Sequence, residues 1–417
     1  HPAPSTASEE IAAAERFVQL APDSPHAWYK VGDALFHFGA LVGLGDVYPR
    51  VAAAFDRSLA LDSTYGPTIQ HLSEVAAGLG DTAGVRRGLE VLFRIDSTSA
   101  IAAARRRHVA AALGDTAGIR NALASDSILT WGPYFIVFYA LDQPLDLRGT
   151  EEVYPRAHAR SATAGERSEV EGLWNRYEVM RGRRSRAPLL SGSAESERLA
   201  LAVLDGLFAD GDSSRAAAAA RALEAQLGRP LAAADADQAR ARFALGQYGL
   251  FSSRVDLVSR AIEDLRAARV DTASPWDADV SRGYALFLDA QLARARGTPN
   301  SEELLRRVDS ALADPFAINW ASYGNLIAAR LHEKRGELPA ALAALRRRFI
   351  GTSTHPHYVT YLREEGRLAA LLGDRKGAIR AYRHYLALRG QAEPALQPQV
   401  RQVRAELEAL ERESTDR

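Results

Sequence analysis

One five-residue segment occurs twice, and the distance between its two copies limits what this chain can fold into. Gly80–Gly84 reads Gly-Asp-Thr-Ala-Gly and returns unchanged as Gly114–Gly118, an offset of 114 − 80 = 34 residues. A period of this size indicates stacked copies of one supersecondary unit. Gly80 and Gly114 can end a helix in the left-handed conformation, and Asp81 and Asp115 can cap the helix that follows. The segment therefore predicts a tight turn between two antiparallel helices.

Apolar residues after each turn support the same interpretation. Val85 and Leu89 follow the first copy, and Ile119 and Leu123 follow the second copy, with the spacing that places both side chains on one helical face. A single helix pair cannot cover such a face. We therefore expect neighbouring pairs to cover one another, as in an array of repeats.

Composition favours helices over strands throughout the chain. Of the 417 residues, 47% are hydrophobic and only 8% aromatic, which fits closely packed, alanine-rich helices. Alternating runs of β-branched residues are missing, so the sequence predicts essentially no sheet. The predicted fold class is an all-α superhelical solenoid of antiparallel helix pairs.

Several positions match the pattern of a known repeat family. The first-helix pattern of that family has an aromatic residue, then Leu-Gly and Tyr, and these positions are occupied here by Trp28, Val31, Gly32 and Leu35. The late copy matches with Gly366, Gly373, Asp374, Ala378 and Tyr382. On these residues the chain resembles the tetratricopeptide repeat (TPR) family, most closely over 25–130 and 320–390. The resemblance implies a solenoid that binds proteins, and it implies no reaction.

The C-terminal part resembles a narrower group of sequences. Residues 361–367, 381–386 and 401–407 are similar to the repeat regions attached to bacterial serine/threonine kinases and transcriptional activators. The chain has no glycine-rich phosphate loop and no His-Arg-Asp or Asp-Phe-Gly triplet of a kinase. The resemblance therefore implies a scaffold without the kinase or DNA-binding module.

A change of composition near the middle predicts two arrays. Residues 183–195 mix Arg, Gly, Ser and Pro without periodicity and are the predicted hinge. The N-terminal array is expected at 1–182 and the C-terminal array at 196–417. Within the latter, 398–411 has one narrow apolar stripe and is expected to be a capping helix.

Charge and cysteine content exclude several classes of function. Lys+Arg and Asp+Glu both total 52, so no net field attracts nucleic acid, and no cysteine is available for a disulfide or a thiolate metal site. No stretch approaches the roughly 20 apolar residues that cross a bilayer. The first residue is His1, for which a mature chain cut from a precursor, and hence an extracytoplasmic location, is the first explanation and a cloned fragment the second.

Two histidines and two carboxylates are the candidate functional residues. Asp33 and His37 fall on the first helix of one repeat, and His71 and Glu74 on the first helix of the next. Such helices line the inner groove, so the four groups can converge to hold a metal or to act as acid and base. The alternative is a polar groove face that contacts a peptide, with Trp28 as a further groove residue. We favour this alternative and expect no metal, cofactor or catalytic residue.

The histidines near the C-terminus offer a second, weaker combination. His355 and His357 flank a proline at the start of a predicted helix, and His384 lies in the next helix. A metal site in this loop is one interpretation, and a turn at a helix start is the other.

The sequence thus favours a non-catalytic scaffold for protein–protein interaction, whose partners include copies of itself. A secreted or surface subunit that assembles head to tail into a filament is the sharper form of this hypothesis. The alternative is a sensory or docking module that binds a peptide or small ligand in its concave groove. An enzyme is the third hypothesis, and only the four-residue cluster supports it.

Overall fold

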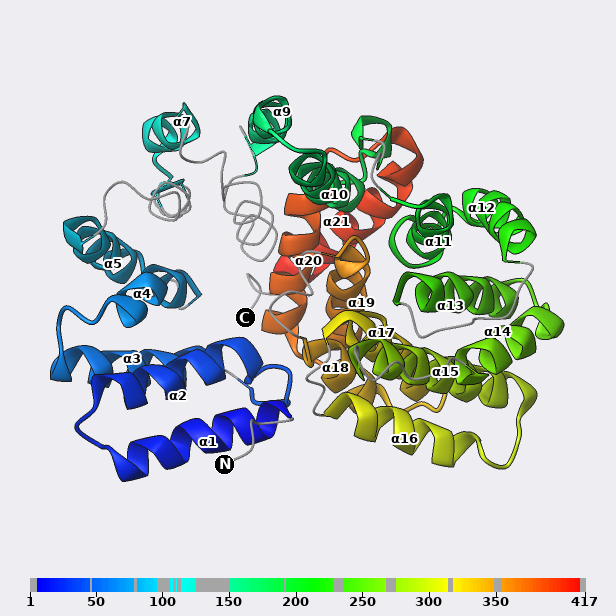
Figure 1. The fold of residues 1–417 in the computed structure, drawn as a ribbon, viewed down its shortest axis with the longest axis horizontal. Coiled ribbons are helices and arrows are strands. Elements are labelled where there is room, and N and C mark those ends of the chain that lie inside the picture. Colours follow the sequence, from blue (N-terminus) through cyan, green and yellow to red (C-terminus); the bar gives the residue numbers. More distant parts are fainter. Residues whose placement is uncertain are drawn as a thin grey trace. The chain divides into compact units, whose positions relative to one another are not determined.

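The computed structural model describes most of the chain. The described residues are 6–45, 47–78, 81–95, 106–107, 110, 114–124, 147, 150–188, 190, 193–227, 236–267, 275–313, 318–348 and 355–412. Every regular element within these ranges is a helix, and the helices pack pairwise in sequence order, so the fold is an all-α solenoid (Figure 1). The apolar run 134–140, expected from its composition to be buried, lies outside these ranges.

The chain divides into two compact units. The first contains the described residues up to Tyr177, with Ala187 and Pro188, and the second contains the other described residues from Glu178 onward. The predicted hinge at 183–195 stays a prediction. Its described beginning includes a short 3₁₀ turn, η1 (Arg184–Arg186), which belongs to the second unit.

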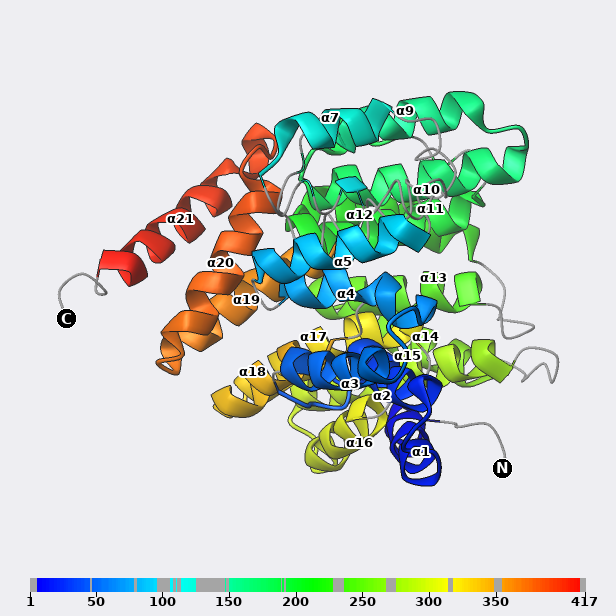
Figure 2. The ribbon, with the colours of Figure 1, turned by 90° about the vertical axis from the view of Figure 1, so that its left-hand side faces the viewer.

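The first unit is built from helix hairpins. Its described helices are α1 (Ala7–Leu20), α2 (Pro25–Phe38), α3 (Val47–Leu61), α4 (Gly66–Gly78), α5 (Thr82–Ile95), α7 (Thr116–Ala124), α9 (Thr150–Arg160) and α10 (Ala164–Met180), the last of which ends in the second unit. α2 pairs with α3 and α4 pairs with α5, while α1 packs on α2 and α3 packs on α4. Figures 1 and 2 both show α4 and α5 side by side.

The second unit repeats the same arrangement. Its helices are α11 (Glu195–Asp205), α12 (Ser213–Gln226), α13 (Ala236–Phe251), α14 (Val255–Ala267), α15 (Pro275–Arg296), α16 (Ser301–Ala313), α17 (Ile318–Glu333), α18 (Leu338–Arg346), α19 (Tyr358–Leu371), α20 (Arg375–Arg389) and α21 (Gln397–Arg412). Each odd-numbered helix from α11 to α19 pairs with the next helix, and α13 also packs on α11 and α15. α21 packs on α20 and ends the stack, at the place where the sequence predicts a cap over 398–411.

The second unit differs from the expected pattern at the end of its first helix. The sequence predicts one continuous helix over 196–209, whereas α11 ends at Asp205 and the π-helical turn η2 (Gly206–Asp210) follows. Gly206 lies against the next helix, because a Cβ built on it would be 2.9 Å from the Asp212 carbonyl oxygen and 3.0 Å from the Ala216 Cβ. A second 3₁₀ turn, η4 (Pro394–Leu396), precedes α21.

The Gly-Asp turns have one geometry in both units. The Asp81 Oδ1 atom accepts a hydrogen bond from the amide of Gly84 at 2.9 Å, and Asp115 and Asp374 accept from Gly118 at 2.9 Å and Gly377 at 3.0 Å. The amide of each aspartate donates back to the preceding helix, to the carbonyls of Ala76, Ala110 and Ala369. Gly114 and Gly373 have φ values of 68° and 77°, which suit glycine because it lacks a Cβ. Gly80 lies outside the described residues.

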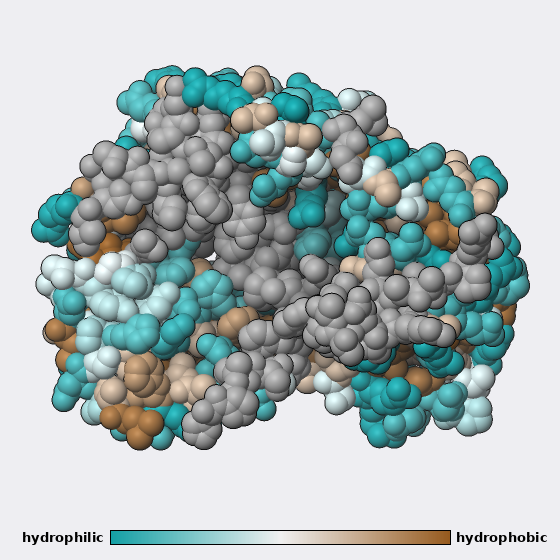
Figure 3. All heavy atoms as spheres, in the orientation of Figure 1, coloured by the Kyte–Doolittle hydropathy of each residue, from teal (hydrophilic) through white to brown (hydrophobic). Residues whose placement is uncertain are grey.

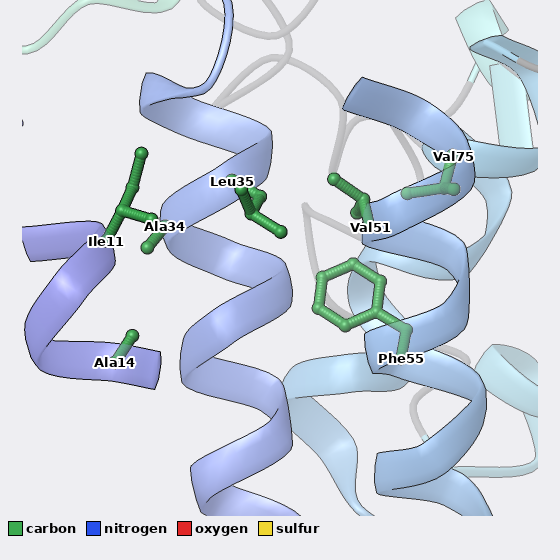
Figure 4. Packing of buried hydrophobic residues seen from close by; sticks show 7 residues of the cluster. All are labelled: Ile11, Ala14, Ala34, Leu35, Val51, Phe55 and Val75. Carbon is green, nitrogen blue, oxygen red and sulfur yellow. The ribbon is translucent and has the colours of Figure 1, made fainter. Parts of the chain in front are cut away.

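A continuous hydrophobic core holds the first four helices together. Ile11, Ala14, Ala34, Leu35, Val51, Phe55 and Val75 form its buried cluster. Figure 4 shows Leu35 of α2 pointing toward α3, which contributes Val51 and Phe55, while Ile11 and Ala14 of α1 face the other side of α2. Gly32 allows this close packing, since a Cβ on it would lie 2.3 Å from the Phe55 ring.

Two helices of the second unit bury residues on several sides. α13 and α19 bury residues around most of their circumference, as expected for helices covered on several sides. Gly366 on α19 lies against Tyr382 on α20 in the way that Gly32 lies against Phe55. No helix within the described part of the chain is both long and apolar enough to cross a membrane.

Candidate functional site

A polar stripe runs along the face of α2 that is turned toward α4. The side chains of Tyr29, Asp33 and His37 follow one another at a spacing of four residues, which keeps them on one helical face. α2 is well defined at its start, because the Ser24 hydroxyl accepts from the amide of Ala27 and Pro25 occupies the first turn. The stripe is thus presented by a capped helix.

Hydrogen bonds order the stripe within α2, and an ion pair joins it to α4. The Tyr29 hydroxyl donates to Asp33 Oδ1 at 3.2 Å, and His37 Nδ1 lies 2.9 Å from the Asp33 carbonyl oxygen and 3.3 Å from Asp33 Oδ1. His71 Nε2 approaches the same Asp33 oxygen at 3.7 Å, while His71 Nδ1 lies 2.7 Å from Glu74 Oε2. The four residues that the sequence places on facing helices therefore form one chain, Glu74–His71–Asp33–His37.

The acceptors around the imidazoles assign their protons. His37 Nδ1 faces two oxygens of Asp33, so it carries a hydrogen and donates, which leaves Nε2 as the nitrogen that gains or loses a proton. His71 Nδ1 donates in the same way to Glu74. The exposed fraction of the side chain falls from His37 to Glu74 in this cluster. The side chains of His37 and Asp33 are 33% and 24% exposed, and those of His71 and Glu74 are 16% and 5% exposed. The His37–Asp33 end is the accessible end.

Charge and burial act in opposite directions on these groups. Burial would raise the pKa of Asp33, but the hydrogen bond from His37 and the charges of His37, His71 and Lys30 outweigh it and lower this pKa. Burial would lower the pKa of His37, but its bonds to Asp33 and the nearby charges of Asp33 and Glu74 raise this pKa. Asp33 is consequently an ionised carboxylate, and the pKa of the neighbouring His37 imidazole lies above its ordinary value.

Aromatic rings surround the cluster of Glu74, His71, Asp33 and His37. The His71 ring stacks on Phe55 at a centroid distance of 5.8 Å, and Tyr29 lies 5.9 Å from Tyr65. His26 Nδ1 bonds the Tyr65 hydroxyl at 2.6 Å. Sequence reasoning did not identify Tyr29, Tyr65 or His26, although the spacing of Tyr29 from Asp33 was a usable signal.

The cluster does not have the geometry of a metal centre. No group of three or more histidine, aspartate or glutamate side chains within the described ranges is arranged to hold a metal ion. An Asp-oriented imidazole is also the arrangement of a general base, but such a base needs a nucleophile or a bound substrate. The hydroxyls of Ser58 and Thr68 are buried and bond each other at 2.8 Å within the core.

Trp28 does not join this cluster. Its indole Nε1 donates to the carbonyl oxygen of Pro22 at 2.8 Å, and so it ties α2 to the loop after α1. One residue along a helix is a rotation of about 100°, which turns Trp28 away from the stripe that contains Tyr29 and Asp33.

The C-terminal histidines also have a structural setting. His357 is buried, its ring stacks on Tyr323 at 4.1 Å, and its Nε2 donates to the Ser322 carbonyl at 3.0 Å. Burial lowers the pKa of His357 to about 3, so this imidazole is neutral. His384 contacts the Tyr358 ring on another face of the hairpin. His357 and His384 thus pack around the start of α19, where His357 occupies the N-cap position without a side-chain capping hydrogen bond.

Comparisons with known proteins add little to this geometry. No family model and no curated protein matches this chain. A chain in the solved structure described as "Structure of Naa15/Naa10 bound to HypK-THB" is similar over 97% of this chain and 70% of its own length, at 13% sequence identity and a TM-score of 0.23. Similarity at this level carries no argument about function. The fold assignment rests on the helices and their pairing.

Proposed function

We propose that this chain is a non-catalytic helical-repeat protein that binds a segment of a partner protein on the α2–α4 face, here defined by Tyr29, Asp33, His37, Tyr65 and His71. The single observation that carries the proposal is the stripe of polar and aromatic side chains that is hydrogen-bonded along α2 and joined to α4 by the Asp33–His71 ion pair. Partly exposed aromatic and polar groups held in place in this way are typical of binding surfaces.

The packing of α2 supports the same conclusion. Its hydrophobic residues Ala34 and Leu35 are buried against α1 and α3, whereas Asp33 and His37 keep part of their surface accessible. The stripe is thus additional to the hydrophobic core. A face that is ordered but is not consumed by packing remains available to a ligand.

We further infer that the hairpins are tetratricopeptide repeats. The offset of 34 residues between Asp81 and Asp115, which make the same turn, supports this assignment. So does the glycine–aromatic contact that recurs as Gly32–Phe55 and Gly366–Tyr382. The narrower likeness to repeat regions of bacterial kinases and activators rests on the sequence pattern alone.

Selection from a random peptide display library against the whole chain tests the binding site. Peptides enriched on the natural chain should lose binding to the Tyr29→Ala and His37→Ala variants. They should keep binding to Arg57→Ala, which removes an exposed side chain on α3. Enrichment of the same peptides on Tyr29→Ala and His37→Ala would contradict the proposed site, and so would a selection that enriches none. Binding of free amino acids or metabolites in a small-molecule screen, without peptide enrichment, would point to the small-ligand form of the sensory or docking module.

Self-assembly is the second candidate function, and one surface favours it. α1 leaves Phe17 and Leu20 36% and 85% exposed, and Figure 3 shows hydrophobic residues over the part of the surface where α1 ends. A secreted or surface-exposed filament, as the sequence suggests, would need this apolar end of α1 to contact another copy. Analytical ultracentrifugation of the natural chain and of Leu20→Gln tests it: a monomer at every concentration would remove this candidate.

A further inference from the structure

We propose that the α2–α4 face holds a lysine or arginine side chain of its partner against Asp33, and that protonation of His37 releases it. This inference rests on the proposed function, since it names the partner chemistry and the regulation of the same site. It is carried by the pairing of Asp33, the geometry of His37 and the aromatic rings beside them.

Asp33 differs from most carboxylates of this chain in the cations that neutralise it. In most other ion pairs of the described residues the partner is arginine, as in Glu224 with Arg254 at 2.8 Å and Glu365 with Arg348 at 2.7 Å. Among the described residues, the ion-pair partners of Asp33 are the imidazoles of His37 and His71. Lys30 acts on Asp33 through its charge, without a hydrogen bond. The negative charge of Asp33 is therefore paired with a full positive charge on His37 only while His37 is protonated.

The geometry of His37 links this balance to pH. His37 Nδ1–H stays on Asp33 in both protonation states, so the proton that comes and goes is on Nε2. With that proton, Asp33 and His37 are a neutral ion pair. Without it, Asp33 carries an accessible negative charge on a partly buried face, where a cation is attracted more strongly than in bulk water. The other charged or titratable groups nearby are Tyr29 and Lys30 on α2, His71 and Glu74 on α4, and Tyr65 and His26 beside them.

The rings beside Asp33 suit a cationic side chain rather than a neutral one. Tyr29 and Tyr65 lie 5.9 Å apart with their planes inclined by 56°, and His26 lies 6.2 Å from each of them. Faces of tyrosine rings attract ammonium and guanidinium groups. A lysine or arginine that reaches Asp33 would thus pass aromatic faces before it meets the carboxylate.

The proton on His37 Nε2 and the cationic side chain of the partner compete to neutralise Asp33, and this competition sets the direction of the pH dependence of binding. Deprotonation of His37 favours the bound cation, and by linkage the bound cation lowers the apparent pKa of His37. Binding should therefore be tighter at about pH 8 than at about pH 5.5. A ligand held by hydrophobic contacts alone would show no such dependence.

The test uses capped tripeptides as probes and NMR signals of the His37 ring as the readout, on the full chain. Acetyl-Gly-Lys-Gly-amide and its arginine counterpart should shift the His37 signals at about pH 8, bind about tenfold more weakly at about pH 5.5, and lower the titration midpoint of His37. Acetyl-Gly-norleucine-Gly-amide should do neither. Asp33→Asn should abolish the difference between lysine and norleucine, whereas Asp23→Asn, which changes an exposed carboxylate of the same unit, should leave it unchanged.

Two results would overturn the inference. Equal shifts with the lysine and norleucine peptides would show that charge is not recognised, and binding that tightens as the pH falls would reverse the proposed sign. Both results differ from a failure of the proposed function. If neutral peptides bind and their binding depends on Tyr29 and His37, the proposed binding site is supported, but the proposed recognition of a cationic side chain is contradicted. Equal binding of methylammonium and the lysine peptide would show that no protein segment is needed, which also contradicts the inference.

Discussion

Arg181 and Arg389 each donate a hydrogen bond to the end of the helix that the other residue closes. Arg181, which follows α10, donates from Nε to the Leu388 carbonyl of α20 at 2.9 Å, and Arg389, the last residue of α20, donates from Nη2 to the Val179 carbonyl of α10 at 3.3 Å. Both contacts lie within the second unit. Helix C-termini carry partial negative charge, so two of them placed together require cations. The two arginines supply this compensation in both directions.

Arg389→Met should destabilise the chain by about 3 kcal/mol, because the guanidinium is 0% exposed and also reaches the Ala209 carbonyl and Asp210. Methionine keeps much of the volume and removes every one of these donations. Arg383→Met is the matched control on the same helix: its ion pair with Glu411 is on the surface and should change stability by no more than about 0.5 kcal/mol. Urea unfolding of both variants measures the difference, and similar midpoints would contradict the role of Arg389.

Gly182→Ala should cost more than Gly211→Ala. Both glycines have positive φ, 68° and 72°, so alanine is strained at either position by about 1 kcal/mol. A Cβ at Gly182 would also lie 2.8 Å from atoms of Ala392 and Leu396, whereas nothing lies within 4 Å at Gly211. The difference between the two losses in free energy of unfolding measures the cost of the contact that the added methyl group at Gly182 makes with Ala392 and Leu396. Equal losses of stability would mean that Ala392 and Leu396 move to accommodate the methyl group without a measurable change in free energy.

His332 should make stability depend on pH on the alkaline side of neutrality. Its Nε2 bonds Asp309 at 2.9 Å and its Nδ1 bonds Glu337 at 2.7 Å, and these partners raise its pKa although burial opposes them. Because the folded pKa exceeds the unfolded value of about 6.5, this stabilisation is complete below about pH 6.5 and is lost as the pH rises through the folded pKa.

The measurement is the free energy of unfolding of the natural chain and of His332→Gln across that pH range. The gap between the two curves should be widest near neutral and mildly acidic pH and should narrow as the pH increases. Parallel curves would show that His332 contributes no proton-linked stability.

Local chemistry made the hairpins predictable from the sequence. A Gly-Asp turn such as Gly373-Asp374 needs only a positive φ and one capping carboxylate, and both are written in adjacent residues. The cluster of Asp33 and His71 was predictable for a related reason, since a repeat of known period places successive first helices side by side. Trp28 was assigned to the same face as Asp33 because an aromatic residue suits a binding surface. Residue type does not show which face of the helix a side chain occupies.

Long-range polar contacts could not be predicted in the same way. Two basic runs of the sequence, 105–107 and 346–348, have the composition of solvated helix faces, yet Arg107 is buried. Arg346 and Arg348, from the other basic run, bond Glu365 at 3.2 and 2.7 Å within the second unit. A charged residue is usually exposed, so its sequence neighbourhood gives no sign of a partner far along the chain.

Gly32→Ala and Gly172→Ala should change stability in opposite directions, although both replace a glycine inside a helix. At Gly32 the added methyl would meet the Phe55 ring at 2.3 Å, and overpacking of this kind costs about 1–3 kcal/mol. At Gly172 on α10 nothing lies within 4 Å, so alanine should stabilise by about 0.5–1 kcal/mol through its higher helix propensity. Gly366→Ala provides a second case, because its methyl would meet Tyr382 at the same 2.3 Å, and it should behave as Gly32→Ala does. Thermal and urea unfolding of the three variants decide the matter: a stabilising effect at Gly32 or Gly366 would mean that the glycine–aromatic contact does not set the spacing of the two helices in each hairpin.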